Sequence, residues 1–162
     1  RAADGSVTMT VDVLDLQALL HESSAAEGDL RSVTPESLPP APAAAAIGHV
    51  HLHVADLDAA RRFYADVLGF DVVTRYGAEA LFVSAGGYHH HVGLNTWAGK
   101  GASPPPPGAA GLRWFAIEHP SAAEREETVS RVREAGIDVE TIGSDYLVRD
   151  PSRNGIRLTA RS

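Results

Sequence analysis

The sequence predicts an α+β fold of two paired βαβββ units whose strands form a cupped mixed sheet around a cleft. Two observations lead to this fold class. An alternating strand, an amphipathic helix and three further strands follow one another over residues 47–97, and the same order starts again over 111–160. The residues Gly-Phe-Asp-Val at 69–72 also return as Gly-Ile-Asp-Val at 136–139. Because the helix of each unit covers one face of its sheet, the two remaining faces must meet and enclose a core or a cleft.

The first unit begins at residues 47–54, where apolar and polar side chains alternate as they do in a half-buried strand. Asp56 is a suitable N-cap for a helix over about 57–68, which carries an apolar stripe. Further strands of this unit are expected at 69–72, 80–85 and 89–97.

A loop over 99–111, with four consecutive prolines at 104–107, separates the two units. The second unit then opens with a strand over 112–118. A helix is predicted over 121–135, because Ser121 and Glu124 have the spacing of a capping box. Its later strands are expected at 136–139, 146–149 and 156–160, the last two joined by a turn at 150–155.

Residues 1–46 do not have the pattern of an independent domain. Residues 1–20 predict one strand and one short helix, which cannot bury a core alone, and are interpreted as the tail of a preceding domain. Residues 21–46 are rich in proline and alanine and predict a linker to the domain over 47–162. We expect the strand over 6–13 to dock on a partner chain or a preceding domain.

The composition restricts the function classes. Fourteen basic residues stand against twenty-one acidic ones, for a net charge of −7, which disfavours nucleic acid and anionic membranes as partners. The chain has no cysteine, which excludes disulfides, thiolate metal sites and cysteine nucleophiles. No apolar run approaches the roughly 20 residues that span a bilayer, and the first residues do not form a signal peptide. A cytoplasmic location is therefore expected.

Polar side chains occupy the strand faces that turn away from the helices. Alternation places His49, His51 and His53 on one such face of the first strand, and sends His90 to the opposite side from its neighbours. The same reasoning puts these residues on the inner faces of later strands: His89, His91, Asn95, Trp97, Trp114, Glu118 and Arg157. Such side chains make a poor core but a good lining for a cleft.

Several of these motifs together resemble the vicinal oxygen chelate superfamily, which includes glyoxalases, bleomycin resistance proteins and extradiol dioxygenases. The resemblance rests on Gly48-His49, on residues 56–70 and on the turn at 150–155. The stretch Gly-Tyr-His-His-His-Val-Gly-Leu-Asn-Thr-Trp at 87–97 is similar to the catechol-2,3-dioxygenase-like branch. That branch has two paired domains in tandem, and residues 11–20 resemble the end of its first domain.

The resemblance implies a divalent metal in the cleft, with His49, His91, Trp114 and Arg157 at the equivalent corners. Dioxygenase-type members commonly have His at the third corner and Glu at the fourth. Trp114 and Arg157 have no lone pair to offer a metal, so the site is expected to be incomplete, with only His49 and His91 as ligands. No cofactor is certain on this basis, and Fe²⁺, Mn²⁺, Zn²⁺ or Ni²⁺ are the candidate ions.

Three functions remain open, and whether the chain is an enzyme is undecided among them. The first is a dioxygenase-like or glyoxalase-like enzyme, in which the metal chelates two vicinal oxygens of the substrate and His91, His49 or His89 takes part in catalysis. The second is a metal-free protein that binds an aromatic or anionic small molecule through Trp114, Trp97, Arg157, Asn95 and Glu118. The third is a structural half of a tandem-domain enzyme. The expected partners are a small molecule and either a second copy of the chain or an N-terminal domain.

Overall fold

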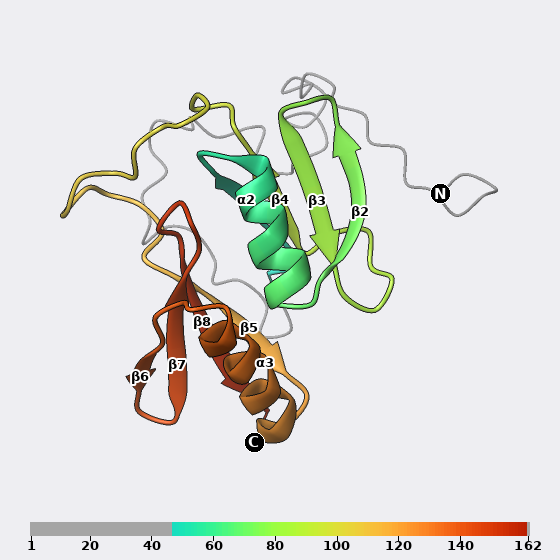
Figure 1. Ribbon diagram of the computed structural model, residues 1–162, viewed down its shortest axis with the longest axis vertical. Coiled ribbons are helices and arrows are strands. Elements are labelled where there is room, and N and C mark those ends of the chain that lie inside the picture. The colour runs from blue at the N-terminus through green and yellow to red at the C-terminus, as the bar shows by residue number, and fades with distance from the viewer. Residues whose placement is uncertain (1–46, 162) are drawn as a thin grey trace, which may run out of the picture. The chain divides into compact units, whose positions relative to one another are not determined.

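The computed structural model describes residues 47–161, so the predicted strand over 6–13 and the predicted segments 1–20 and 21–46 lie outside the described residues. From Gly48 onward the described residues belong to one compact unit. Figure 1 shows its strands and helices. The first half contains β1 (Val50–His53), α2 (Leu57–Arg61), the π-helix η3 (Arg62–Val67), β2 (Asp71–Tyr76), β3 (Ala80–Ser84) and β4 (Val92–Asn95). The second half contains β5 (Phe115–His119), α3 (Ala122–Glu134), β6 (Glu140–Ile142), β7 (Asp145–Arg149) and β8 (Gly155–Ala160).

The two halves repeat the same sheet topology. The strands of the first sheet lie in the order β1-β4-β3-β2 and those of the second in the order β5-β8-β7-β6. In both sheets the first strand pairs in parallel with the last, and the remaining pairs are antiparallel. The predicted α+β class and the two βαβββ units are confirmed, with the eight strands arranged as two four-stranded mixed sheets.

Both helices begin and end where local chemistry predicts. The Asp56 carboxylate accepts a hydrogen bond of 2.6 Å from the Ala59 amide, and the Ser121 hydroxyl accepts one of 3.2 Å from the Glu124 amide. These bonds satisfy amides that the first helical turn leaves without a partner. The α2 helix continues into η3, and Gly69 and Gly136 follow η3 and α3 with φ of 88° and 73°, a left-handed conformation that glycine adopts at low cost. The repeated Gly-X-Asp-Val phrase therefore marks the same helix end in both units.

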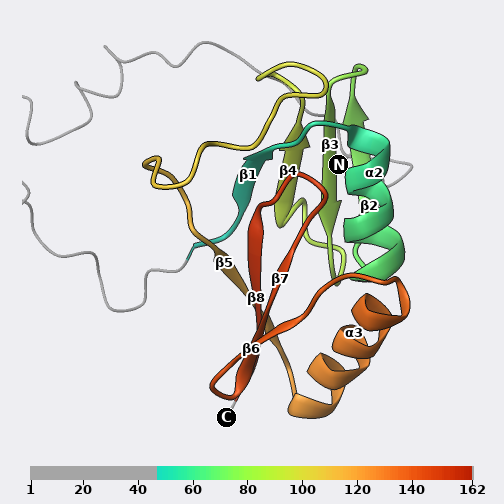
Figure 2. The ribbon, with the colours of Figure 1, turned by 60° about the vertical axis from the view of Figure 1, so that its left-hand side comes forward.

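One hydrophobic core serves both units. Each helix lies on one side of its sheet (Figure 2), and the buried residues of both units form a single cluster. The faces follow the predicted alternation: Leu52 and Val54 are buried while His51 and His53 are exposed. In β8, Ile156 and Leu158 are completely buried. The polar face of β1 is therefore exposed, whereas β3 and β4 are buried on both faces.

The turn at residues 150–155 joins the second unit to the first. Asp150 is buried and accepts a hydrogen bond of 3.1 Å from the Tyr64 hydroxyl of η3. The side-chain amide of Asn154 donates to the His53 carbonyl at 3.1 Å, and the Ser152 hydroxyl accepts from the Ala55 amide at 2.9 Å. The sequence predicts no more than a chain reversal here, but the turn also holds the end of β1 in place.

Candidate functional site

Three imidazoles, one from just before β1 and two from the loop before β4, come together. His49 precedes β1, and His89 and His90 lie in the 85–91 loop. One ring nitrogen from each of the three lies within 4.8 Å of the other two. The ring centroids are 4.5 Å apart for His49 and His90 and 4.6 Å apart for His89 and His90. We call His49, His89 and His90 the three-histidine cluster, and its geometry could hold a metal ion.

His90 lies with its neighbours, so the expectation that alternation sends it away from them is wrong. The strand β4 begins only at Val92, and the preceding loop turns through Gly86 and Gly87, whose φ angles are 62° and 72°. Period-two alternation applies only to extended strand, and residues 89–91 are outside it. The His90 side chain turns inward instead, with 5% of the residue exposed.

His51 is the close neighbour of the cluster. Its Nε2 lies 3.2 Å from Nε2 of His90, so one of the two rings donates a hydrogen bond to the other. Gly93 leaves room for the His51 ring, since a Cβ there would lie 3.1 Å from three of its atoms. Burial, with smaller contributions from the neighbouring histidines, lowers the pKa of His90 to about 4. Burial and then His49 also lower the pKa of His51, so that both rings favour the neutral form whose nitrogen has a lone pair.

His91 lies apart from this cluster. Its Nδ1 accepts a hydrogen bond of 3.1 Å from the Ala85 amide, and its ring lies 4.7 Å from that of Tyr88 and 6.3 Å from that of Phe70. These contacts close the 85–91 loop. The imidazole nitrogens that lie close to that of His49 belong to His89 and His90. A role for His91 as a ligand beside His49 stays a prediction.

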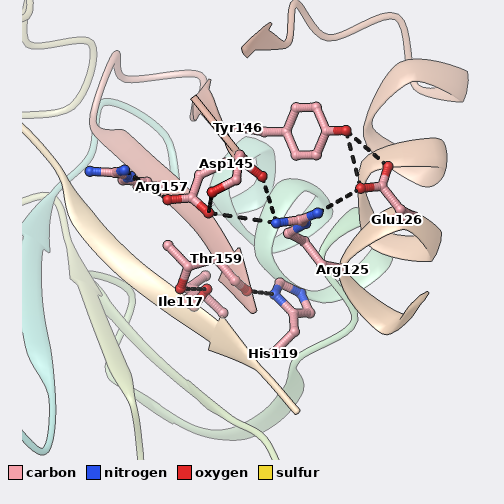
Figure 3. A network of polar contacts seen from close by, with 9 residues as sticks. Ile117, His119, Arg125, Glu126, Asp145, Tyr146, Arg157 and Thr159 are labelled. Atoms are coloured by element: carbon pink, nitrogen blue, oxygen red, sulfur yellow. Dashed lines mark hydrogen bonds and ion pairs between the residues drawn. The ribbon is translucent and has the colours of Figure 1, made fainter. Parts of the chain in front are cut away.

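Trp114 and Arg157, which the resemblance implies for the third and fourth corners, lie together as a pair. The Arg157 guanidinium lies 5.3 Å from the Trp114 ring centroid and donates to the Asp145 carboxylate at 2.7 Å and 3.0 Å. Asp145 also pairs with Arg125 at 3.5 Å, as Figure 3 shows. A guanidinium held in this way is a fixed positive charge, and neither side chain offers a lone pair. Neither side chain is therefore suited to be a metal ligand.

The other predicted ligand-binding residues lie in separate places. Asn95 is buried, with 3% exposed, and its side-chain oxygen accepts a hydrogen bond of 3.2 Å from the Trp97 amide. Trp97 is 56% exposed. Glu118 is exposed on β5 and pairs with Arg161 at 2.9 Å. Over residues 47–161, no side-chain hydrogen bond or ion pair joins these three to the Trp114–Arg157 pair.

A groove runs beside β1 and the start of β5. It has a volume of about 1110 Å³ and is lined by residues 102–114 on one side. His51, His53, Arg149 and Asn154 line it on the other side. Trp114 is 43% exposed, and four prolines accompany it in this lining. Such a wall of apolar rings suits the flat face of an aromatic ligand.

Sequence reasoning missed two parts of this arrangement. The first is the contact of His90 with His51, which depends on a loop whose shape alternation cannot describe. The second is the set of hydrogen bonds around Asp150. Burial raises the pKa of this carboxyl, and the hydrogen bonds from Asn154, Tyr64 and Ser152 oppose that rise. The Asp-Pro-Ser-Arg-Asn-Gly stretch could have indicated the second, because Asp and Asn side chains commonly bond the backbone of their own turn.

A search of the described helices found none long and apolar enough to cross a membrane.

Comparison with known proteins agrees with this fold. A family model described as the glyoxalase/bleomycin resistance protein/dioxygenase superfamily matches residues 46–158. Catechol-2,3-dioxygenase of Bacillus subtilis (strain 168) is 44% identical over 152 residues, which cover 93% of this chain and 50% of that protein. The chain thus spans about half the length of this curated relative.

Solved structures show the same likeness. The crystal structure of a lactoylglutathione lyase from Agrobacterium tumefaciens is 29% identical, with a TM-score of 0.53, and the match covers 76% of this chain and 96% of that one. TnmS3, an antibiotic binding protein from Streptomyces sp. CB03234, shares the fold at 20% identity and a TM-score of 0.54, over 75% of this chain and 99% of that one. With its two βαβββ units and the match to the family model, the chain belongs to the glyoxalase/bleomycin resistance protein/dioxygenase superfamily.

Proposed function

We propose that this chain is part of a cytoplasmic dioxygenase of the catechol-2,3-dioxygenase kind, and that its domain over 47–161 is a supporting half without the inherited metal centre. The 44% identity to catechol-2,3-dioxygenase of Bacillus subtilis supports the kind of activity. Because the chain covers 50% of that relative, the proposal assigns the reactive metal to another domain. A small aromatic molecule is the proposed substrate class.

The single observation that carries this proposal is the contact of Asp145, Arg157 and Trp114. Arg157 donates to Asp145 at 2.7 Å and lies over Trp114, so two inherited metal corners carry a paired cation and an indole. Neither the guanidinium, which is paired with Asp145, nor the indole offers a lone pair to a dication. The same ion pair occupies the guanidinium, which argues against Arg157 as the clamp of an anionic ligand.

Restoration of the inherited ligand set tests the proposal. The test protein carries Trp114→His and Arg157→Glu, which place His and Glu at the two corners. It also carries His89→Asn, so that the three-histidine cluster is incomplete. We expect this protein to bind Fe²⁺ at least tenfold more tightly than its His89→Asn parent, measured by anaerobic titration of untagged protein. Arg149→Glu in the same background is the matched control, because it makes the same charge change at an exposed arginine.

The His89→Asn parent tests the proposal by itself, even if the restored variant fails to fold. If the His89→Asn parent binds one equivalent of Fe²⁺ below micromolar concentration and cleaves catechol rings, the domain has its own metal centre and the proposal is wrong. We expect neither Fe²⁺ binding nor ring cleavage. Ring cleavage is measured as oxygen consumption in the presence of catechol.

A second function is favoured by the groove beside Trp114. Its volume of about 1110 Å³ and its lining of prolines and an exposed indole suit a metal-free aromatic ligand. The chain has two tryptophans, so Trp97→Phe leaves Trp114 as the only indole reporter. Saturable quenching of Trp114 fluorescence by catechol, in the presence of a chelator, would support binding in the groove. A linear response without saturation would count against it.

A further inference from the structure

The three-histidine cluster has the chemistry of a separate metal site. Its residues come from the position before β1 and from the 85–91 loop, and they include His49 of the first inherited corner but neither Trp114 nor Arg157. His49 and His89 are exposed, and His90 is buried beneath them. No side-chain hydrogen bond ties the imidazole of His49 or His89 to any residue over 47–161. Their rings contact those of His51 and Tyr88, at 5.3 Å for His49 and 4.2 Å for His89, and a turn toward an ion would shift these contacts.

His90 supplies a second, independent observation. Its Nε2 contacts His51 at 3.2 Å, whereas its Nδ1 is buried and has no hydrogen-bond partner among the described residues. A buried polar atom without a partner costs about 1–3 kcal/mol, and such atoms are rare in native structures. A metal ion bound at this nitrogen would remove that cost. The contact with His51 would then resemble the outer hydrogen bond that orients most metal-bound histidines.

The distances fit a tetrahedral ion after small side-chain rotations. Zinc–nitrogen bonds of about 2.0–2.1 Å in a tetrahedron place the bound nitrogens roughly 3.4 Å apart. The cluster nitrogens already lie within 4.8 Å of one another. Rotation of the exposed His49 and His89 rings toward the fixed His90 ring can close this difference. The exposed side of the cluster leaves a fourth position open to water.

The ligand chemistry selects the class of ion. The cluster contains imidazoles and no carboxylate. Neutral imidazole suits Zn²⁺, Cu²⁺ and Ni²⁺, whereas Mg²⁺ and Ca²⁺ prefer oxygen ligands. Non-haem Fe²⁺ commonly takes two histidines and a carboxylate, which this cluster does not provide.

We propose that His49, His89 and His90 bind one divalent transition-metal ion, with Zn²⁺ preferred, and that this ion fastens the 85–91 loop to the start of the first unit. The site shares His49 with the first inherited corner, but the inherited β5 and β8 corners take no part in it, so it does not depend on the proposed dioxygenase function. His51 is a positioning residue that holds the His90 ring. The ion has a structural role here and leaves an open position that a ligand in solvent can reach.

Calorimetric titration of untagged, chelator-treated protein with Zn²⁺ tests this site, since a histidine tag would compete for the ion. We expect one equivalent to bind, and we expect His49→Asn and His89→Asn each to weaken binding at least tenfold. Both side chains are exposed, so both variants should fold. His53→Asn is the matched control, because it removes an exposed β1 histidine outside the cluster.

Two results would overturn the proposal. The first is that the parent protein does not bind Zn²⁺, or that neither His49→Asn nor His89→Asn weakens its binding. The other is an equal loss in His53→Asn, which would indicate scattered histidine binding without a defined site. Titration with Mg²⁺ should show no binding, and X-ray absorption at the zinc edge should show three imidazole ligands.

Discussion

Asp150 accepts four hydrogen bonds in the turn that contacts the first unit. Its carboxylate accepts hydrogen bonds from the Ser152 amide at 2.8 Å, from the backbone and side chain of Asn154 at 2.8 Å each, and from the Tyr64 hydroxyl at 3.1 Å. Tyr64 is completely buried, and burial, together with Asp150, raises its pKa well above the usual value. The tyrosine therefore remains a donor, and all four groups require an acceptor at Asp150.

We expect Asp150→Asn to destabilise the protein markedly. The new amide group would present N–H donors to groups that are themselves donors, and each buried polar group left unpaired costs about 1–3 kcal/mol. Urea unfolding followed by circular dichroism measures the loss. Asp138→Asn makes the same charge change at an exposed position and should leave stability nearly unchanged. Equal stability of the two variants would show that the hydrogen bonds at Asp150 contribute little.

At the scale of the elements, the parallel pair of β5 and β8 depends on a close backbone approach. Gly155 opens β8, and a Cβ at this position would lie 2.5 Å from the Arg113 carbonyl oxygen and 3.2 Å from the Trp114 Cβ. Backbone atoms cannot shift to relieve such a clash, whereas the end of a flexible side chain can. Glycine at this position therefore allows β8 to reach the chain that leads into β5.

Gly155→Ala is expected to cost about 1–3 kcal/mol of unfolding free energy, as overpacked sites typically do. Because the clash lies beside Trp114, the near-ultraviolet signal of tryptophan should also change. Gly111→Ala is the control, since nothing lies within 4 Å of a Cβ built at that position. A Gly155→Ala protein as stable as Gly111→Ala would contradict this account of the strand pair.

At the scale of the whole molecule, one core joins both units, so an ion bound in the first unit should stabilise all of the described domain. A ligand that binds only the folded state adds about 2.7 kcal/mol when its concentration is one hundred times its dissociation constant. We expect Zn²⁺ to raise the melting temperature of a single transition, and a chelator to reverse the rise. His89→Asn should show no rise. Two separate transitions, with only one of them sensitive to Zn²⁺, would show that the units unfold independently.

Much of the fold follows from local patterns in the chain. Asp56 and Ser121 cap helices that begin where predicted, and Gly69 and Gly136 end them, because each signal acts within a few residues. The alternation in β1 correctly placed Leu52 in the core. In β5 and β8 the predicted inner residues likewise lie outside the buried core. The same motifs by themselves are enough to indicate the superfamily.

The candidate site required long-range packing. His51 and His90 are 39 residues apart, and their contact depends on how the 85–91 loop turns before β4 begins. Trp114 and Arg157 could be named from the sequence, but the ion pair that holds Arg157 comes from Asp145 on the neighbouring strand. Periodicity describes which face a side chain takes within regular structure. Loop conformations and partners from other strands are set by the packing of the whole domain, so they could be seen only in three dimensions.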